Sequence, residues 1–509
     1  MITQRITSVL FGMLTRISIF AAISCVSLLG CSGSGLGARE EAMVKVPNNE
    51  PIITFEGAAR TRRALASVGV VSGPVIGGSY GFPFGAPSVS VDFSLAGYVQ
   101  EEYFLEGTAT SFTQVGTWTT DGAWTAAPAG TAAYKTRLLV ARPTDPTQFN
   151  GTVVVEWLNE TAGWDIADDF IYENEELLRS GYAWVGVSAQ ALGVQLSPFA
   201  LKAWDPARYA SLNHPGDAYA YDIFSQVAQA IRSPQGVNPL PGLTVAHILA
   251  DGHSQSANGL TTYVNAIHPL AEQYDGFLLH GRGVSGLPLH AGAEGAVPAA
   301  AIIRTDTTAP VLSLEDEWSV AVAFAWVVRQ PDGPMFRLWE VAGTGHVDAY
   351  ENSLVGPIVG HDLGFPPLVC AEPLNEAPHR YLANSAVDRL NAWVTNGSPP
   401  PHAPAFIQIV NAGVVRDAYG NAKGGIRLPQ LEVPTATLTG PGNSGPGSCP
   451  VGGVTAPFDA ATLHMLYPRH GSYVRRFVHA TNDLQRAGFL LPPDAEDAKN
   501  RAAQSAVGH

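Results

Sequence analysis

A serine inside the segment DGHSQSANGL, residues 251–260, stands in a setting typical of a nucleophile. Ser254 follows an apolar, β-branched run and precedes a helical pattern, so it falls on a strand-to-helix turn of the type G-x-S-x-G. Such a turn strains the backbone of the serine, and the residues two before and two after it must be small to avoid a clash. Gly252 and Ser256 are both small, although Ser256 stands where the pattern has glycine. The segment therefore predicts a nucleophilic serine.

A serine hydroxyl needs a base within hydrogen-bond reach, and the base needs an acid that fixes its tautomer. In chains that use this turn the order is serine, acid, histidine, with the acid and the histidine in loops after later strands. The run WEVAGTGHVDAY places His346 just after a candidate strand, and PVLSLEDEWS places three acids, Glu315, Asp316 and Glu317, after an earlier one. We predict a Ser-His-acid triad. His346 and Asp348 lack further ligands at a useful spacing, so we expect no metal and no organic cofactor.

The oxyanion of an acyl-transfer reaction needs backbone N–H donors. We expect one from Gln255, at the start of the helix, and one from the loop LNETAGWD that follows the run GTVVVEW. Asn159 and Glu160 are the nearest candidates in that loop, and their alternative role is to form a turn and cap the next helix. Trp157, Trp164 and Trp318 are candidates for the wall of a substrate pocket or for simple packing.

These residues need a scaffold, and the hydrophobic pattern supplies one. Helical patterns over 165–179, 217–231, 255–267 and 320–328 separate short runs rich in β-branched residues. The runs cover residues 134–142, 151–157, 181–189, 245–252, 274–280, 309–314 and 335–343. Strands separated by crossover helices are parallel, and a parallel sheet is covered on both faces. The fold class is therefore α/β, with a doubly wound, mostly parallel sheet and a long C-terminal addition after His346.

From about Gly81 to its end the chain also resembles a known family, the bacterial "alpha/beta hydrolase domain" proteins. The matching segments are GYVQEEYFLEGTA, YKTRLLVARP, FNGTVVVEWLNETAGWD, GYAWVGVSAQ, HPGDAYAYDIFSQ, GHSQSANGLTTYVNAI, RQPDGPMFRLWEVAGTGHVD and AVDRLNAWVTNGSPPP. The resemblance implies Ser254 as nucleophile and His346 as base. Many hydrolases of this superfamily have aspartate where this chain has Ser319, and the family often has glutamate two residues earlier. We therefore expect Glu317 as the acid, followed by Asp316 and then Glu315.

The N-terminus has the pattern of an export signal, with Arg5 and Arg16, an apolar run over 17–29 and the lipobox-like LLGC. We expect cleavage before Cys31 and a lipid on its sulfur, which would anchor the protein to a bacterial membrane. We expect the outer membrane, with the protein facing the periplasm; plain secretion is the alternative. An oxidising compartment favours a disulfide between Cys370 and Cys449 over two free thiols.

The composition is that of a globular protein. Charged residues make up only 14% and the formal net charge is −15, with no basic run, so nucleic acid is excluded as a partner. We expect a signal over 1–31, a tether over 32–80 and a catalytic domain over 81–509. The predicted activity is hydrolysis of a small carboxylic ester. Amide, peptide or lactone cleavage by the same triad, and a lipid-anchored binding protein without activity, are the alternatives; the oligomeric state is open.

Overall fold

The computed structural model describes residues 68–290 and 297–509. The predicted signal with Cys31 and most of the predicted tether lie outside these described residues. Within the described residues, no helix combines the length and the apolarity needed to cross a membrane. The end of the predicted tether belongs to the fold: β1 (Val70–Ser72) pairs with β2 (Tyr98–Val115). The boundary predicted at residue 80 thus lies beyond the first strand of the main sheet, which is formed by Val70–Ser72.

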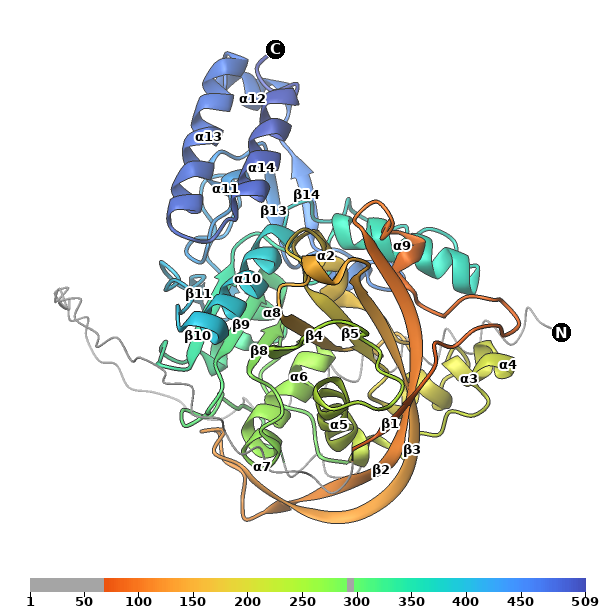
Figure 1. Ribbon diagram of the computed structural model, residues 1–509. Helices are drawn as coiled ribbons and strands as arrows, with labels where there is room; N and C mark the ends of the chain where they lie inside the picture. The colour runs from red at the N-terminus through yellow and green to blue at the C-terminus, as the bar shows by residue number, and fades with distance from the viewer. Residues whose placement is uncertain (1–67, 291–296) are drawn as a thin grey trace. The chain divides into compact units, whose positions relative to one another are not determined.

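One sheet of ten strands organises the described part of the chain (Figure 1). Its order is β10-β9-β8-β7-β4-β5-β3-β2-β1-β6. The run from β10 to β5 is parallel and contains six of the seven predicted strands. These strands are β4 (Thr152–Trp157), β5 (Ala183–Val187), β7 (His247–His253), β8 (Gly276–His280), β9 (Val311–Asp316) and β10 (Phe336–Val341). The predicted mostly parallel α/β sheet is confirmed.

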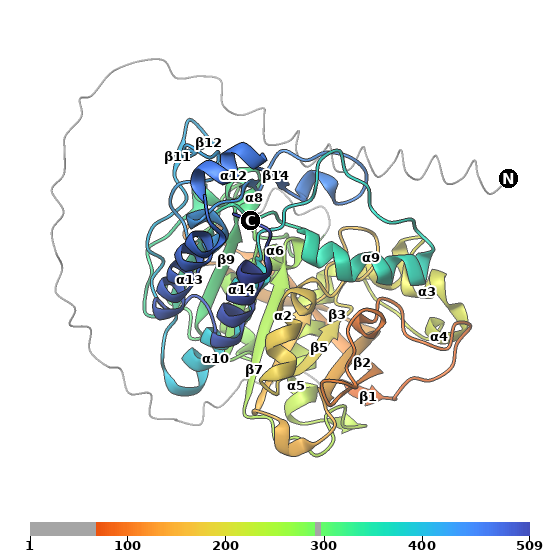
Figure 2. The ribbon, with the colours of Figure 1, turned by 90° about the horizontal axis from the view of Figure 1, so that it is seen from above.

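Side chains alternate between the two faces of these strands and build a separate core on each face. Val153 and Val155 pack with α5 (Ala220–Arg232) and α6 (Gln255–Thr262). Val154, between them, packs on the other face with α2 (Asp168–Arg179) and α10 (Arg380–Asn396). Figure 2 shows the helices from above the sheet. Because both faces are covered, all six residues of β4 are buried, as expected for a central parallel strand.

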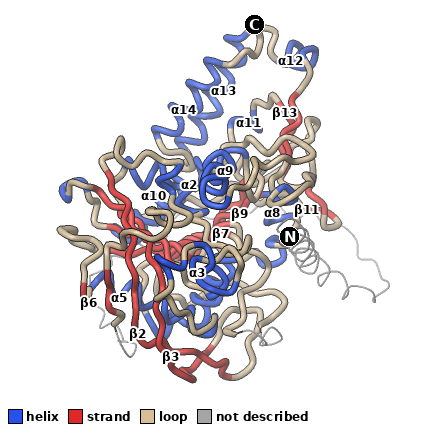
Figure 3. The backbone as a smooth tube through the Cα atoms, turned by 90° about the vertical axis from the view of Figure 1, so that its right-hand side faces the viewer, coloured by secondary structure: helices blue, strands red, loops and turns tan. Residues whose placement is uncertain are grey.

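The antiparallel end of the sheet is larger than the sequence suggests. The seventh predicted strand, 134–142, is the last part of β3 (Thr125–Pro143), which pairs along its length with β2. Figure 3 shows the two as long, adjacent strands. The edge strand β6 (Gln235–Gly236) pairs with β1. Since β3 is antiparallel to β5, it ends the parallel part of the sheet.

The chain after β10 forms the C-terminal addition. It begins with α9 (Ala349–Leu363) and α10, and it contains two small hairpins and a group of helices. The hairpins are β11 (Ile409–Val410) with β12 (Gly413–Val414) and β13 (Ala436–Thr439) with β14 (Val454–Pro457). The helices are α11 (Pro429–Glu432), α12 (Ala460–Leu466), α13 (His470–Arg486) and α14 (Pro492–Gln504). Cys370 and Cys449 are bonded, which confirms the predicted disulfide.

Several shorter helices complete the fold. The predicted helix over 320–328 is wrong in form: the structure has α8 (Glu317–Ala321) and a separate 3-10 turn, Ala325–Val328. Phe324 lies between them with a left-handed φ of 58°, which interrupts a continuous helix. The remaining α-helices are α3 (Leu201–Trp204), α4 (Pro206–Tyr209) and α7 (His268–Ala271).

Candidate active site

Ser254 occupies the tight turn between β7 and α6. Its φ and ψ are 61° and −118°, which is a strained conformation for a residue other than glycine. The turn is held because Ser254 N–H donates to the carbonyl of His280 at 2.8 Å. A Cβ on Gly252 would lie 3.0 Å from the Cβ of Ser256, so the elbow closes on these two residues as their small size predicts. Strain of this kind at an exposed strand end is typical of functional serines.

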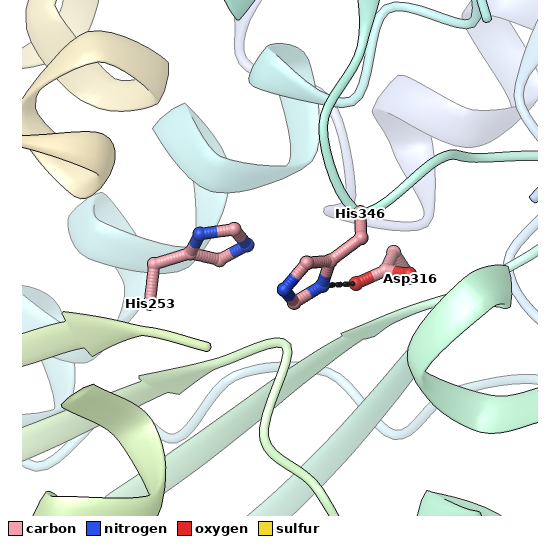
Figure 4. A group of neighbouring side chains, drawn as sticks. All are labelled: His253, Asp316 and His346. Atoms are coloured by element: carbon pink, nitrogen blue, oxygen red, sulfur yellow. Dashed lines mark hydrogen bonds and ion pairs between the residues drawn. The ribbon is translucent and has the colours of Figure 1, made fainter. Parts of the chain in front are cut away.

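His346 lies in the loop after β10, and Asp316 is the last residue of the neighbouring strand β9. His346 Nδ1 donates to Asp316 Oδ2 at 3.0 Å, shown as the dashed line in Figure 4. Ser319 joins them: its hydroxyl donates to Asp316 Oδ2 at 2.5 Å and lies 3.0 Å from His346 Nδ1. Burial would raise the pKa of Asp316, but the contacts with His346 and Ser319 hold that pKa below its ordinary value. Asp316 therefore remains an acceptor.

The prediction that Glu317 is the acid beside His346 is wrong in its geometry. Glu317 points away from the imidazole, and its two oxygens accept from the backbone N–H groups of Gly343 at 2.7 Å and Gly440 at 3.1 Å. It also forms an ion pair with Arg416 at 2.6 Å. A one-residue step along the strand end reverses the direction of a side chain, which explains why the adjacent acid is the one that reaches His346. Asp316, the second choice of the sequence, takes the position.

Glu315 points to the same side of β9 as Glu317 and is also turned away from His346. It accepts a hydrogen bond from the Ser313 hydroxyl at 2.7 Å, and Arg282 lies 3.9 Å away. Burial raises the pKa of Glu315 well above its ordinary value. It is a buried residue of the strand, outside the imidazole contact.

The second ring nitrogen of His346, Nε2, is the one that would accept a proton from the nucleophile. Among the described residues, buried His346 Nε2 makes no hydrogen bond, with Ser254 or with any other group. Ser254 and His346 lie on the same edge of the sheet, because their loops both follow carboxyl ends of parallel strands. In substrate-free enzymes this contact is often loose and tightens only when substrate binds.

The backbone N–H groups proposed for the oxyanion differ in whether they already have an acceptor. Gln255 is the first residue of α6, where N–H groups have no partner within the helix. In the loop after β4, Asn159 N–H donates to the Ile166 carbonyl at 3.0 Å, so it is not available. Within the described residues the N–H of Glu160 has no acceptor. The amide of Asn159 donates to the His253 carbonyl at 3.1 Å, which ties this loop to the elbow.

His253 packs against His346. Its ring stacks on that of His346, with centroids 4.3 Å apart and planes at 29° (Figure 4). Burial, aided by His346 and His280, lowers the pKa of His253 to about 3, so the ring is neutral at ordinary pH. Ligand atoms of His253, His346 and Asp316 lie within 4.8 Å of one another. Stacked rings direct their in-plane lone pairs alongside one another, however, and His346 Nδ1 already contacts Asp316, so the trio is a poor metal cage.

The three tryptophans have different positions. Trp157 is a core residue, and its indole N–H donates to Gln190 Oε1 at 2.8 Å. Trp164 is half-buried against Phe199. Trp318 alone contacts the site, with its ring 4.9 Å from the ring of His346. Sequence reasoning did not identify Ser319 as a member of this group, although the resemblance marks position 319 as one where many hydrolases have aspartate.

Comparisons with known proteins show what this chain is similar to. Among solved structures, an esterase from Rhizomucor miehei is 11% identical and the match covers 57% of this chain and 84% of that one, with a TM-score of 0.29. A lidless serine hydrolase from Xanthomonas campestris is 11% identical (51% and 97%, TM-score 0.27). A serine hydrolase homologue from Coxiella burnetii is 10% identical (50% and 97%, TM-score 0.27).

No relative is found among curated protein sequences. The match that decides the family is to a family model described as "Alpha/beta hydrolase domain", which extends over residues 71–500. It spans the sheet from β1 onward, the elbow of Ser254, the loop of His346 and most of the C-terminal addition. The chain belongs to this alpha/beta hydrolase family.

Proposed function

We propose that this hydrolase cleaves carboxylic esters through a triad of Ser254, His346 and Asp316. One observation supports the proposal: a serine with strained backbone and a His–Asp pair both follow carboxyl ends of parallel strands in one sheet. A hydroxyl, an imidazole and a carboxylate in this order are the groups that acyl transfer requires.

The reaction would begin with attack of Ser254 Oγ on the ester carbonyl carbon. His346 Nε2 takes the serine proton, and Asp316 stabilises the imidazolium through Nδ1. The N–H groups of Gln255 and Glu160 would hold the negative oxygen of the tetrahedral intermediate. When the C–O bond breaks, His346 returns the proton to the leaving alcohol. Water then repeats these steps on the acyl-enzyme and releases the acid.

The test combines activity with covalent labelling. Ser254→Ala and His346→Ala should each lower kcat for an aryl ester by several orders of magnitude while the circular dichroism spectrum is unchanged. A fluorophosphonate should label the wild type and not Ser254→Ala, and Ser472→Ala, which changes a half-buried serine of α13, should label normally. Turnover retained in Ser254→Ala would remove the proposal. Folded wild type that resists labelling would instead favour a binding protein.

The ester preference needs its own measurement. An ester and an amide with the same acyl group should be compared on wild-type protein, because amide cleavage also requires protonation of a poor leaving group. We expect a larger kcat/KM for the ester. A larger value for the amide would keep the triad and change the substrate class.

A further inference from the structure

The loop that carries His346 is held by a segment more than a hundred residues further along the chain. The backbone N–H groups of His346 and Val347 both donate to the carbonyl of Val451, at 3.0 and 3.2 Å. One carbonyl thus fixes the backbone on which the imidazole stands. Val451 belongs to the C-terminal addition, in the segment 440–453, which we call the clasp.

The clasp is itself tied down close to this contact. Cys449 lies two residues before Val451 in the same 3-10 turn, is fully buried and is bonded to Cys370. Gly452, next to Val451, accepts from Asn375 N–H at 3.0 Å. The Val451 carbonyl therefore has a fixed position relative to the segment 370–375.

The clasp also reaches the turn that carries Asp316. Glu317 is the residue after Asp316, and its Oε1 accepts a hydrogen bond from Gly440 N–H. The carbonyl of Pro450 accepts from the Trp318 indole N–H at 3.1 Å. The second oxygen of Glu317 accepts from Gly343, in the His346 loop. Glu317 therefore links three segments: the turn that carries Asp316, the loop that carries His346, and the clasp.

The fit between these segments leaves no space. A Cβ on Gly440 would lie 2.5 Å from the backbone nitrogen of Trp318, and one on Gly345 would lie 3.1 Å from the carbonyl of Gly452. Both positions need glycine because backbone approaches backbone. A contact this close transmits displacement of the clasp to both the acid turn and the histidine loop.

We propose that the clasp, fixed by Cys370–Cys449 and joined through Glu317, is a positioning element that sets His346 and Asp316 for proton transfer; this rests on the proposed function. Loosening it would displace the imidazole relative to Asp316 and to the serine. Small displacements of catalytic groups reduce turnover by as much as about 100-fold. The effect should fall on kcat, since the clasp holds the groups that move the proton.

The first test is the double variant Cys370→Ser/Cys449→Ser in the full chain. We expect kcat for the aryl ester to fall about 10- to 100-fold, with KM within about threefold, and the acidic limb of the kcat/KM–pH profile to move. A purely structural disulfide would lower the melting temperature and leave the pH profile of the folded enzyme unchanged. A folded double variant with wild-type kcat and pH profile would overturn the proposal.

Glu317→Gln covers the case in which the double variant does not fold. It keeps the side-chain shape but removes the charge that pairs with Arg416 and one of the two acceptors. We expect kcat to fall about 10-fold, with a moved acidic limb. Wild-type kcat and pH profile in Glu317→Gln would overturn the proposal in that case.

A parallel measurement on Ser254→Ala separates this inference from the proposed function. If Ser254→Ala is inactive while both clasp variants match the wild type, only the inference fails. If Ser254→Ala keeps its activity, the triad itself is wrong whatever the clasp variants do.

Discussion

Two groups of buried carboxyl residues lie near the nucleophile, and their pKa values move in opposite directions. At the edge of the sheet, Asp316 is fully buried, yet its contacts with His346 and Ser319 keep its pKa low. Beneath the elbow, between β4, β7 and α2, burial raises the pKa of four acids well above the ordinary value. This carboxyl cluster consists of Glu156, Asp169, Glu173 and Asp251.

The contacts explain the difference. Among the described residues, the carboxyl oxygens of Asp251 and Glu173 have no hydrogen-bond partner, and the acids beside them, Asp169 among these, raise both pKa values further. Like charges at this depth cannot both ionise. Asp316 instead faces an imidazole N–H and a hydroxyl. Burial alone therefore does not decide whether an acid is charged. Asp169 also contacts an imidazole, with Oδ1 2.8 Å from His280 Nδ1, but burial and the neighbouring Asp168 raise its pKa, whereas the contacts with His346 and Ser319 lower the pKa of Asp316.

Asp316→Asn should produce the largest effect. The amide keeps the shape but cannot stabilise the imidazolium and can favour the wrong tautomer of His346, so we expect kcat to fall by roughly 10³- to 10⁴-fold. Steady-state kinetics on an aryl ester measure it. Asp251→Asn is the matched control from the carboxyl cluster, and its kcat should stay within a few-fold of the wild type. Equal decreases of kcat in Asp316→Asn and Asp251→Asn would contradict the conclusion that only Asp316 acts in catalysis.

A carboxylate at position 319 should replace part of what Asp316→Asn removes. The hydroxyl of Ser319 is as close to His346 Nδ1 as the Asp316 oxygen is, each at 3.0 Å. In Asp316→Asn/Ser319→Asp we expect kcat to recover by roughly 10-fold or more over the single variant. Ser319→Asp alone, which places two acids together, should not exceed the wild type. If kcat did not recover in the double variant, a carboxylate at position 319 could not replace the one at position 316 as the partner of His346.

The carboxyl cluster predicts a pH dependence of stability. Its acids hold protons that the unfolded chain has released above about pH 4, so the free energy of unfolding should decrease as pH rises from there toward the raised folded pKa values. Asp251→Asn should reduce this decrease by at least about 1.4 kcal/mol, the equivalent of one pKa unit. Urea unfolding at pH 5 and pH 8 measures it.

Asp316→Asn is the comparison for that experiment. Because the folded pKa of Asp316 is lowered, its contribution to stability is present above the unfolded pKa near 4 and is lost only as pH falls further. Its removal should leave the change between pH 5 and pH 8 as in the wild type. If Asp316→Asn altered the difference in unfolding free energy between pH 5 and pH 8 as much as Asp251→Asn does, the carboxyl cluster would not be the source of the pH dependence.

The parallel strands and Ser254 could be predicted because their signals are local. Short, mostly apolar runs indicate β4, β7 and β10, and the small residues around Ser254 define the elbow. The histidine followed from its place after the last of these strands. The long β2 could not be found in the same way, because its stability comes from pairing with β3 over a long stretch rather than from its own pattern.

The acid and its support depended on information that no local pattern contains. Asp316 and Glu317 are adjacent, and only the contacts of Glu317 with the distant Arg416 and Gly440 determine which of them turns toward His346. The sequence also suggests Asn159 as an oxyanion donor, but its N–H donates to the Ile166 carbonyl. In each case two adjacent residues have similar chemistry, and a hydrogen-bond or ion-pair partner elsewhere in the fold determines which of them is available to the site.

Ser319→Ala is the smallest of the expected effects and the most specific. It removes a hydroxyl that donates to Asp316 Oδ2 and contacts His346 Nδ1, while leaving the carboxylate and the imidazole in place. A single hydrogen bond of this kind contributes about 1 kcal/mol, so kcat should fall roughly fivefold. Because Ser319 N–H also caps the turn by donating to Asp316 Oδ1 at 2.7 Å, the backbone of α8 should be unchanged. A loss of 10³-fold would instead make the hydroxyl an obligatory part of the proton path, and the comparison between the two acid groups would have to include it.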